Sequence, residues 1–228
     1  MTEAVERANR IGARTADAQV KKRTMKARFA VAIALVLTLP NVASAQVSRA
    51  DLNLALGQLR LAVRALPPVA ALPRIQAAVT WLSGRADTTN PAEVSQEYVR
   101  SLQQLAELLR IDRRSEVMDD VADELEAKVE HCRLLGIGMG GAVLLNVNTR
   151  RGPETVGDWQ VLYLLKVYEH VTGAAATVFP GLSTPTQAAL EPGRYWLWAR
   201  DPSTGRTSER ALVRVLGQTQ LHVDLPIP

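Results

Sequence analysis

The chain has 228 residues, with 27 lysines and arginines against 23 aspartates and glutamates and a formal net charge of +4. The first 45 residues hold eight of the basic and three of the acidic side chains, so the remainder is near neutral and lacks the basic surface typical of nucleic-acid-binding proteins. Apolar residues make up 47% of the chain, which excludes a disordered protein, and Cys132 is the only cysteine, so packing rather than disulfides must stabilise the fold.

The N-terminal segment has the three-part pattern of a bacterial export signal. Five basic residues at 21–28 precede an apolar run at 29–39, which leads to the small-x-small sequence Ala43-Ser44-Ala45. This run of about eleven residues is too short to span a bilayer as a helix, which takes roughly 20 residues. We therefore predict that residues 1–45 are a leader with a cleaved signal peptide, and that the mature chain begins at Gln46.

Two alternatives to this interpretation of the leader remain. Met25 stands directly before the signal pattern and is well placed as the true start, in which case residues 1–24 are never made. If the signal is not cleaved, the apolar run is a membrane anchor. With cleavage, we expect a periplasmic or secreted protein without a permanent membrane span.

The next segment, 46–135, is predicted to be a helical domain, because its apolar residues recur with the period of a helix. Four stretches carry this pattern: 50–66, 72–83, 90–111 and 115–135. Pro67-Pro68 ends the first helix, Gly84 is suited to a left-handed cap after the second, and Asn90-Pro91 starts the third. The fourth opens at Asp112 or Ser115. Short loops between four helices indicate an antiparallel bundle.

The fourth helix has an apolar stripe and an acidic face. The stripe consists of Val117, Val121, Leu125, Val129 and Cys132. It predicts a buried thiol, with a reactive or intermolecular thiol as the alternative. The acidic side chains are Asp119, Asp120, Asp123, Glu126 and Glu130. Such a charge run is most often solvated, so we expect the acidic face to lie in water.

After the fourth helix the period of the pattern changes to two. The glycine-rich segment 136–141 is predicted to be a linker, since a nucleotide-binding loop needs a preceding strand and a following helix. Alternating runs at 143–148 and 159–168, separated by turn residues, predict a β-sandwich domain at 142–228 that closes with strands at 211–216 and 219–225. The predicted fold class is therefore α+β with two domains, an N-terminal helical bundle followed by a C-terminal antiparallel β-sandwich.

One motif in the second half is similar to a known family. Leu190-Glu191-Pro192-Gly193-Arg194-Tyr195, with its approach at 179–185 and the valine-rich closing hairpin, resembles the Leu-x-Pro-Gly-x-Tyr signature of transthyretin-like or carboxypeptidase regulatory-like β-sandwich domains. The resemblance covers roughly residues 141–227. It implies that the glycine permits a tight turn and that the tyrosine packs or hydrogen-bonds at a sheet corner. It also implies an accessory or adhesive module without chemistry of its own.

No catalytic, cofactor-binding or metal-binding residues are predicted. His131, His170 and His222 are scattered without ligand spacing, and no nucleophile motif is present. The candidate interface or ligand surface consists of Trp196, Trp198 and Arg200, which period two places on one face of a strand. The resemblance implies that this face points outwards from the sandwich.

The sequence leaves three arrangements of these tryptophans open. They pack against the helical bundle, they form a surface for a protein or a ligand, or the strand has the inverted register. We expect an exported, non-enzymatic binding or scaffold protein of the bacterial cell envelope that acts through contacts with a protein partner and binds no cofactor and no nucleic acid. The alternatives are binding of a carbohydrate or small ligand at the tryptophan face, and an envelope enzyme or its accessory subunit.

Overall fold

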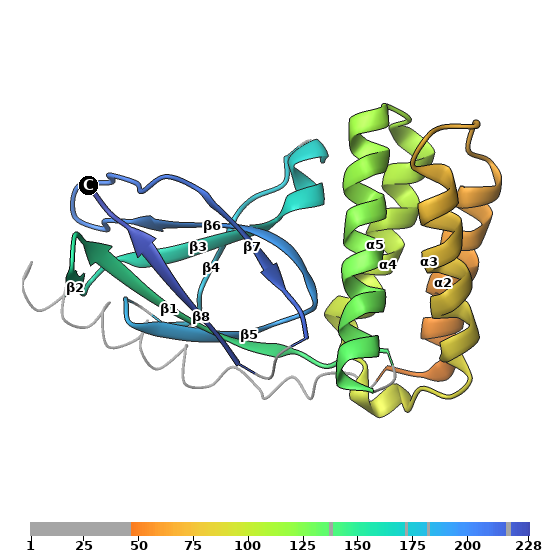
Figure 1. The fold of residues 1–228 in the computed structure, drawn as a ribbon, viewed down its shortest axis with the longest axis horizontal. Helices are drawn as coiled ribbons and strands as arrows, with labels where there is room; N and C mark the ends of the chain where they lie inside the picture. The colour runs from red at the N-terminus through yellow and green to blue at the C-terminus, as the bar shows by residue number, and fades with distance from the viewer. Residues whose placement is uncertain (1–46, 137–138, 172, 182, 218–219) are drawn as a thin grey trace, which may run out of the picture. The chain divides into compact units, whose positions relative to one another are not determined.

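The computed structural model describes residues 47–136, 139–171, 173–181, 183–217 and 220–228. Residues 46–228 form one compact unit in which helices precede strands (Figure 1), so the predicted α+β layout of a helical bundle followed by a mainly antiparallel β-sandwich is confirmed. The predicted export signal and its cleavage site lie outside the described residues. None of the helices in these ranges has both the length and the apolar character needed to cross a bilayer.

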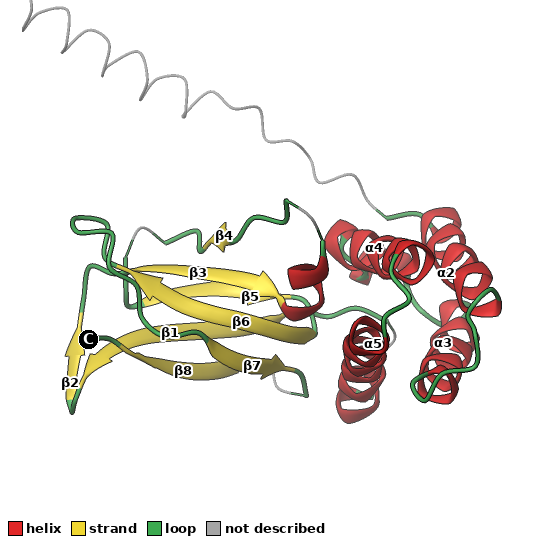
Figure 2. Ribbon diagram, turned by 90° about the horizontal axis from the view of Figure 1, so that it is seen from above, coloured by secondary structure: helices red, strands yellow, loops and turns green. Residues whose placement is uncertain are grey.

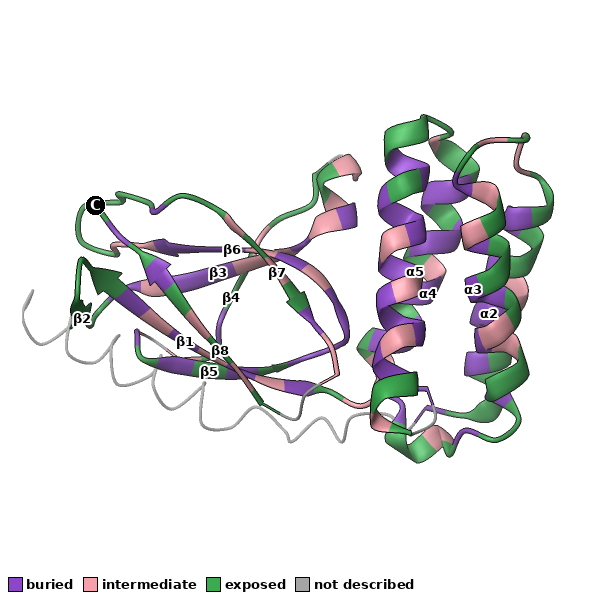
Figure 3. Cartoon of the chain, viewed as in Figure 1, coloured by how far each residue is buried: buried purple, intermediate pink, exposed green. Residues whose placement is uncertain are grey.

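Four α-helices are present in the described part of the first half: α2 (Arg49–Arg64), α3 (Leu72–Ala86), α4 (Gln96–Ile111) and α5 (Ser115–Leu135). A capping box at Ser48 and Asp51 starts α2, and the left-handed Gly136, with φ of 64°, ends α5. The buried side chains follow the inner faces of the helices (Figure 3). Every residue of the predicted stripe on α5 is buried, including Cys132, which confirms the helical period.

Two helix boundaries differ from the prediction. Asn90 caps only a short 3₁₀ turn, η1 (Pro91–Glu93), because a second N-cap follows: the hydroxyl of Ser95 accepts the amide hydrogen of Tyr98 and starts α4 there. The prediction that Gly84 is a left-handed cap is also wrong. Helix α3 continues through this glycine, since nothing in the local sequence breaks the helix before Ala86.

The strands form two four-stranded sheets in the described part of the chain (Figure 2). In sheet A, β1 (Val143–Arg151) pairs with β2 (Glu154–Val156), β5 (Thr186–Leu190) and β8 (Gln220–Pro226). Sheet B has the antiparallel order β4 (Thr177–Val178), β3 (Gln160–Leu165), β6 (Gly193–Arg200) and β7 (Ala211–Val215). Alternate residues of β1 and β6 are buried in the core, as expected from period two.

The closing hairpin expected from the sequence is absent in the described residues. Strand β7 pairs with β6 in sheet B, whereas β8 crosses to sheet A and runs parallel to β1. Residues 166–168, expected to extend the preceding strand, belong instead to the 3₁₀ turn η2 (Lys166–His170). Alternation reveals that a segment is extended and half-buried, but it does not reveal which strand is its partner.

Candidate functional site

The strand face predicted as a candidate surface lies on the outer side of sheet B. Tyr195, Leu197 and Ala199 are buried in the core, so the register is not inverted, and Trp196 and Trp198 lie on the opposite face of β6. Cross-strand pairing brings further apolar residues to this face. We call the following set the outer apolar face: Leu162, Leu164, Val178, Trp196, Trp198 and Leu212.

The two tryptophans differ in exposure. Trp198 is only 8% exposed, and the guanidinium of Arg210 lies 4.7 Å from its ring centroid. Trp196 is partly buried beside Leu212, which is 43% exposed. Arg200 is partly buried, and its Nη2 donates to Gln160 Oε1 at 2.7 Å. The accessible part of the outer apolar face is therefore centred on Trp196 and Leu212.

The helices and the sandwich are joined at the turn before β6. Lys128 Nζ lies 3.2 Å from Glu124 Oε1, with side-chain exposures of 1% and 2%, and it donates to the carbonyl oxygen of Pro192 at 3.0 Å. Glu124 Oε2 accepts the amide hydrogen of Arg194 at 3.0 Å. Helix α5 therefore binds main-chain atoms of the sandwich through a buried ion pair.

Gly193 lies at the centre of this junction. Its backbone is not left-handed, so the tight turn implied by the family resemblance does not explain this glycine. A Cβ atom here would lie 2.5 Å from Glu124 Oε1 and 2.9 Å from Leu165 Cδ1. A glycine fits here because the side-chain ends of Glu124 on α5 and Leu165 on β3 occupy the space that a Cβ atom would need. The hydroxyl of Tyr195 donates to the carbonyl oxygen of Glu191 at 3.0 Å and closes the turn.

The expectation that the acidic face of α5 is solvated is wrong for Asp120 and Asp123. Asp120 Oδ2 accepts from Lys166 Nζ at 2.7 Å and contacts His170 Nε2 at 2.9 Å, while Asp123 pairs with Arg194. Burial tends to raise the pKa of Asp120, but the hydrogen bonds to Lys166 and His170 outweigh it and hold the pKa below the usual value.

Three other acidic residues of this face are more exposed. Asp119 is 57% exposed, with its Oδ1 3.9 Å from Nη1 of Arg74, while Glu126 also pairs with Arg74 and Glu130 pairs with Arg214. The basic partners of the acidic face are 40 or more residues away in the sequence. No local pattern reveals such long-range pairs, and this is why the acidic face was misinterpreted.

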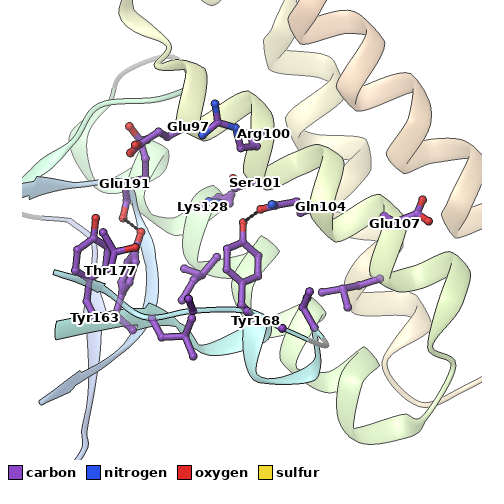
Figure 4. A pocket seen from close by; sticks show the side chains of 18 of the residues that line it. Glu97, Arg100, Ser101, Gln104, Glu107, Lys128, Tyr163, Tyr168, Thr177 and Glu191 are labelled. Carbon is purple, nitrogen blue, oxygen red and sulfur yellow. Dashed lines mark hydrogen bonds between the residues drawn. The ribbon is translucent and has the colours of Figure 1, made fainter. Parts of the chain in front are cut away.

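A groove of about 490 Å³ lies between α4 and the sandwich (Figure 4). Its volume is within the range of small-molecule sites. Helix α4 supplies Glu97, Arg100 and Gln104 to one wall. The sandwich and η2 supply the other wall: Tyr163, Leu164, Leu165, Tyr168, Thr177, Glu191 and Tyr195. Tyr168 donates its hydroxyl hydrogen to Gln104 and so connects the two walls.

Glu191 is the buried acid of this groove. It is 8% exposed, and its Oε2 has no hydrogen-bond partner among the described residues. Burial raises the pKa of Glu191, and the charge of Glu97 adds to this effect, while the Ser95 hydroxyl and the charge of Lys128 oppose it. Burial also raises the pKa values of Tyr163 and Tyr168, so both phenols are protonated at neutral pH.

Little in the sequence indicates this groove. Glu191 occupies a variable position of the turn motif, and nothing nearby predicts that α4 covers it. The histidines do not meet there either: His131 accepts the amide hydrogen of Gly217, His170 contacts Asp120, and His222 is exposed. In the ranges that the structure describes, no group of three or more His, Cys, Asp or Glu residues is suited to hold a metal ion.

Comparisons with protein-family models, curated proteins and solved structures find no match to this chain. The similarity of residues 141–227 to transthyretin-like domains therefore depends on the turn motif and the strand pattern alone.

Proposed function

We propose that the protein is an exported, non-enzymatic binding or scaffold protein of the cell envelope, which contacts a protein partner through the outer apolar face of sheet B. The observation that carries the proposal is the exposure of apolar side chains on this face, at Leu212 beside Trp196 and at Val178 on the edge strand β4. Leu212 and Val178 are 43% and 41% exposed on the same face. Apolar clusters of this kind are typical of interaction sites, and tryptophan is enriched among the residues that dominate binding energy.

The chemistry of the groove also favours binding over catalysis. A buried carboxyl with a raised pKa is an arrangement that a general acid uses, and Glu191 has this property. However, no histidine or cysteine lines the described groove, and its tyrosines are protonated at neutral pH. The hydroxyl of Ser101 is occupied, because it donates to the carbonyl oxygen of Tyr98. The described lining thus offers Glu191 no histidine or cysteine nucleophile, and Glu97 is the carboxyl group that faces it from α4.

Two matched substitutions test the contact surface. Leu212→Lys introduces a charge on the outer apolar face, and Leu61→Lys introduces the same charge on α2, where the leucine is 61% exposed. We expect both variants to keep the melting temperature of the wild type. A partner cross-linked to the exported protein in the envelope is expected to be lost with Leu212→Lys and kept with Leu61→Lys.

Three outcomes contradict this proposal. A partner that is retained by Leu212→Lys, or lost equally from both variants, does not bind the outer apolar face. Robust hydrolase activity of the purified mature protein, abolished by one point substitution, contradicts the non-enzymatic role. Quenching of tryptophan fluorescence by cell-wall fragments, removed by Trp196→Ala, favours the carbohydrate alternative.

A further inference from the structure

The groove beside α4 has an acidic end. Glu97 and Glu191 face it from opposite walls (Figure 4). The nearest buried cation, Lys128, is already bound by Glu124 and by the Pro192 carbonyl oxygen. Its charge is therefore balanced within the fold, and the other cation in the lining, Arg100, lies on α4 with Glu97.

The buried carboxyl of Glu191 requires a donor that the described chain does not supply. Its Oε2 is shielded by the walls of the groove and has no hydrogen-bond partner there. Nearly all buried polar atoms in native proteins are paired, because an unpaired one loses its hydration without compensation. Since a carboxylate accepts its strongest hydrogen bonds from cationic donors, a cation is the best complement for this oxygen.

Three tyrosines line the same groove as Glu191. The ring centroids of Tyr163 and Tyr195 lie 6.1 Å apart at an angle of 62°, and Tyr168 extends the aromatic lining towards α4. Aromatic faces attract ammonium groups. Apolar side chains line the rest of the groove and suit an aliphatic chain: Leu108, Leu164, Leu165 and Val171.

The protein itself contains an internal example of the same chemistry. Lys128 combines a carboxylate, a carbonyl oxygen and an aromatic face, since its Nζ contacts Glu124 and Pro192 and lies 4.9 Å from the ring centroid of Tyr98. The groove offers a comparable set, with Glu191 and Tyr163; Lys128 also lines it, but its Nζ is held by Glu124 and Pro192, and Glu191 Oε2 has no hydrogen-bond partner in the described chain.

We propose that the groove binds a ligand with a primary ammonium group on an aliphatic stem, and that the ammonium donates to Glu191 Oε2 beside the ring of Tyr163. The ligand is either a free alkylamine or the side chain of a lysine in a peptide, which present the same group. This site shares Leu164 with the outer apolar face but not its charged groups, and it stands whether or not that face binds a protein.

Calorimetric titration of the purified mature protein tests the site with four probes. The amines are 1,5-diaminopentane and Nα-acetyl-lysine methylamide, and the neutral controls are 1-pentanol and Nα-acetyl-norleucine methylamide. We expect at least one amine to bind and neither control to bind. Binding of the diamine alone identifies a small-molecule site, and binding of the capped lysine alone identifies a peptide side chain.

Two variants locate the ammonium group. Glu191→Gln keeps the shape of the side chain but removes its charge, and we expect it to weaken amine binding by about 10- to 100-fold, the usual contribution of a hydrogen bond to a charged group. Glu116→Gln removes the same charge from an exposed position at the start of α5, outside the groove, and is expected to leave the affinity unchanged.

The pH dependence of binding provides a test that needs no variant. Glu191 must be ionised, whereas the ammonium stays protonated up to about pH 10. Because the pKa of Glu191 is raised, affinity should increase with pH through its titration. The groups that act on this carboxyl are Ser95, Glu97 and Tyr98 on α4, Lys128 on α5, and Tyr195 on β6.

Each of four results overturns the proposal. They are the absence of binding by both amines, equal binding of the neutral controls, unchanged affinity in a folded Glu191→Gln variant, and amine binding by the wild type that does not change with pH. If Glu191→Gln does not fold, the probe comparison and the pH profile still decide the question.

Discussion

Replacing Lys128 with methionine is expected to destabilise the protein strongly, although the new side chain is apolar and similar in length. The substitution keeps the packing volume but removes the ion pair with Glu124 and the hydrogen bond to Pro192. The Glu124 carboxylate then stays buried, with the amide of Arg194 as its hydrogen-bond donor.

The size of the expected loss of stability follows from the burial of both Lys128 and Glu124. Removing one member of a buried pair costs about 3–5 kcal/mol, because the other charge remains without compensation. For a chain of this size each kcal/mol lowers the melting temperature by roughly 2–4 °C. We therefore expect the melting temperature of Lys128→Met to fall by roughly 6–20 °C.

Denaturant unfolding of the mature protein measures this effect. Arg114→Met is the matched control, because the Arg114 side chain is 64% exposed, so its pair with Asp112, which is 19% exposed, is open to solvent on the arginine side. A solvent-exposed ion pair of this kind contributes about 0–1 kcal/mol to the free energy of unfolding. The double variant Glu124→Gln, Lys128→Met is expected to be more stable than Lys128→Met alone, since no unpaired charge remains in it. The reasoning is refuted if Lys128→Met loses no more stability than the control, or if the two substitutions at the pair are simply additive.

Three further outcomes are expected. Gly193→Ala should lower the melting temperature by several degrees, because the new Cβ has no space beside Glu124. Gly84→Ala should raise the melting temperature slightly, because its Cβ meets open space inside α3. Equal effects of the two substitutions in thermal scans would contradict this explanation. The pKa of Asp120 is lowered in the folded state, so this carboxylate contributes stability above its unfolded pKa of about 4 that is lost as the pH falls through its folded pKa. Asp120→Asn should therefore flatten the acid limb of the stability curve between pH 2 and 5, which chemical denaturation can follow, and an unchanged limb would exclude this role. The intact mass of the exported protein should begin at Gln46, and a mass that retains residues 25–45 would indicate an uncleaved anchor.

Local patterns predicted the elements of the fold well, because burial leaves a periodic signal in neighbouring residues. The stripe from Val117 to Cys132 marked α5 and its buried face correctly. Features that depend on distant residues were missed. The pairing of Asp120 with Lys166 connects positions 46 residues apart in the sequence. The parallel pairing of β8 with β1 joins the last strand of the sandwich in the sequence to the first.

For the candidate surface, alternation placed Trp196 and Trp198 on the correct side of β6. It did not predict that Arg210 covers Trp198, since this contact comes from the segment before β7. The acid of the groove was also missed, because the environment of Glu191 is set by α4, which lies about 90 residues earlier in the chain.

The junction at the turn before β6 has a consequence for how the protein tolerates change. Helix α5 binds the carbonyl oxygen of Pro192 and the amide of Arg194, which are main-chain groups that any residue would present in the same turn. The demands on sequence are therefore concentrated in a few positions: an acid and a lysine four residues apart on the helix, and a glycine in the turn. Side-chain pairs between the two halves, such as Asp120 with Lys166 and Glu130 with Arg214, add demands of their own, because both members of such a pair must be kept together.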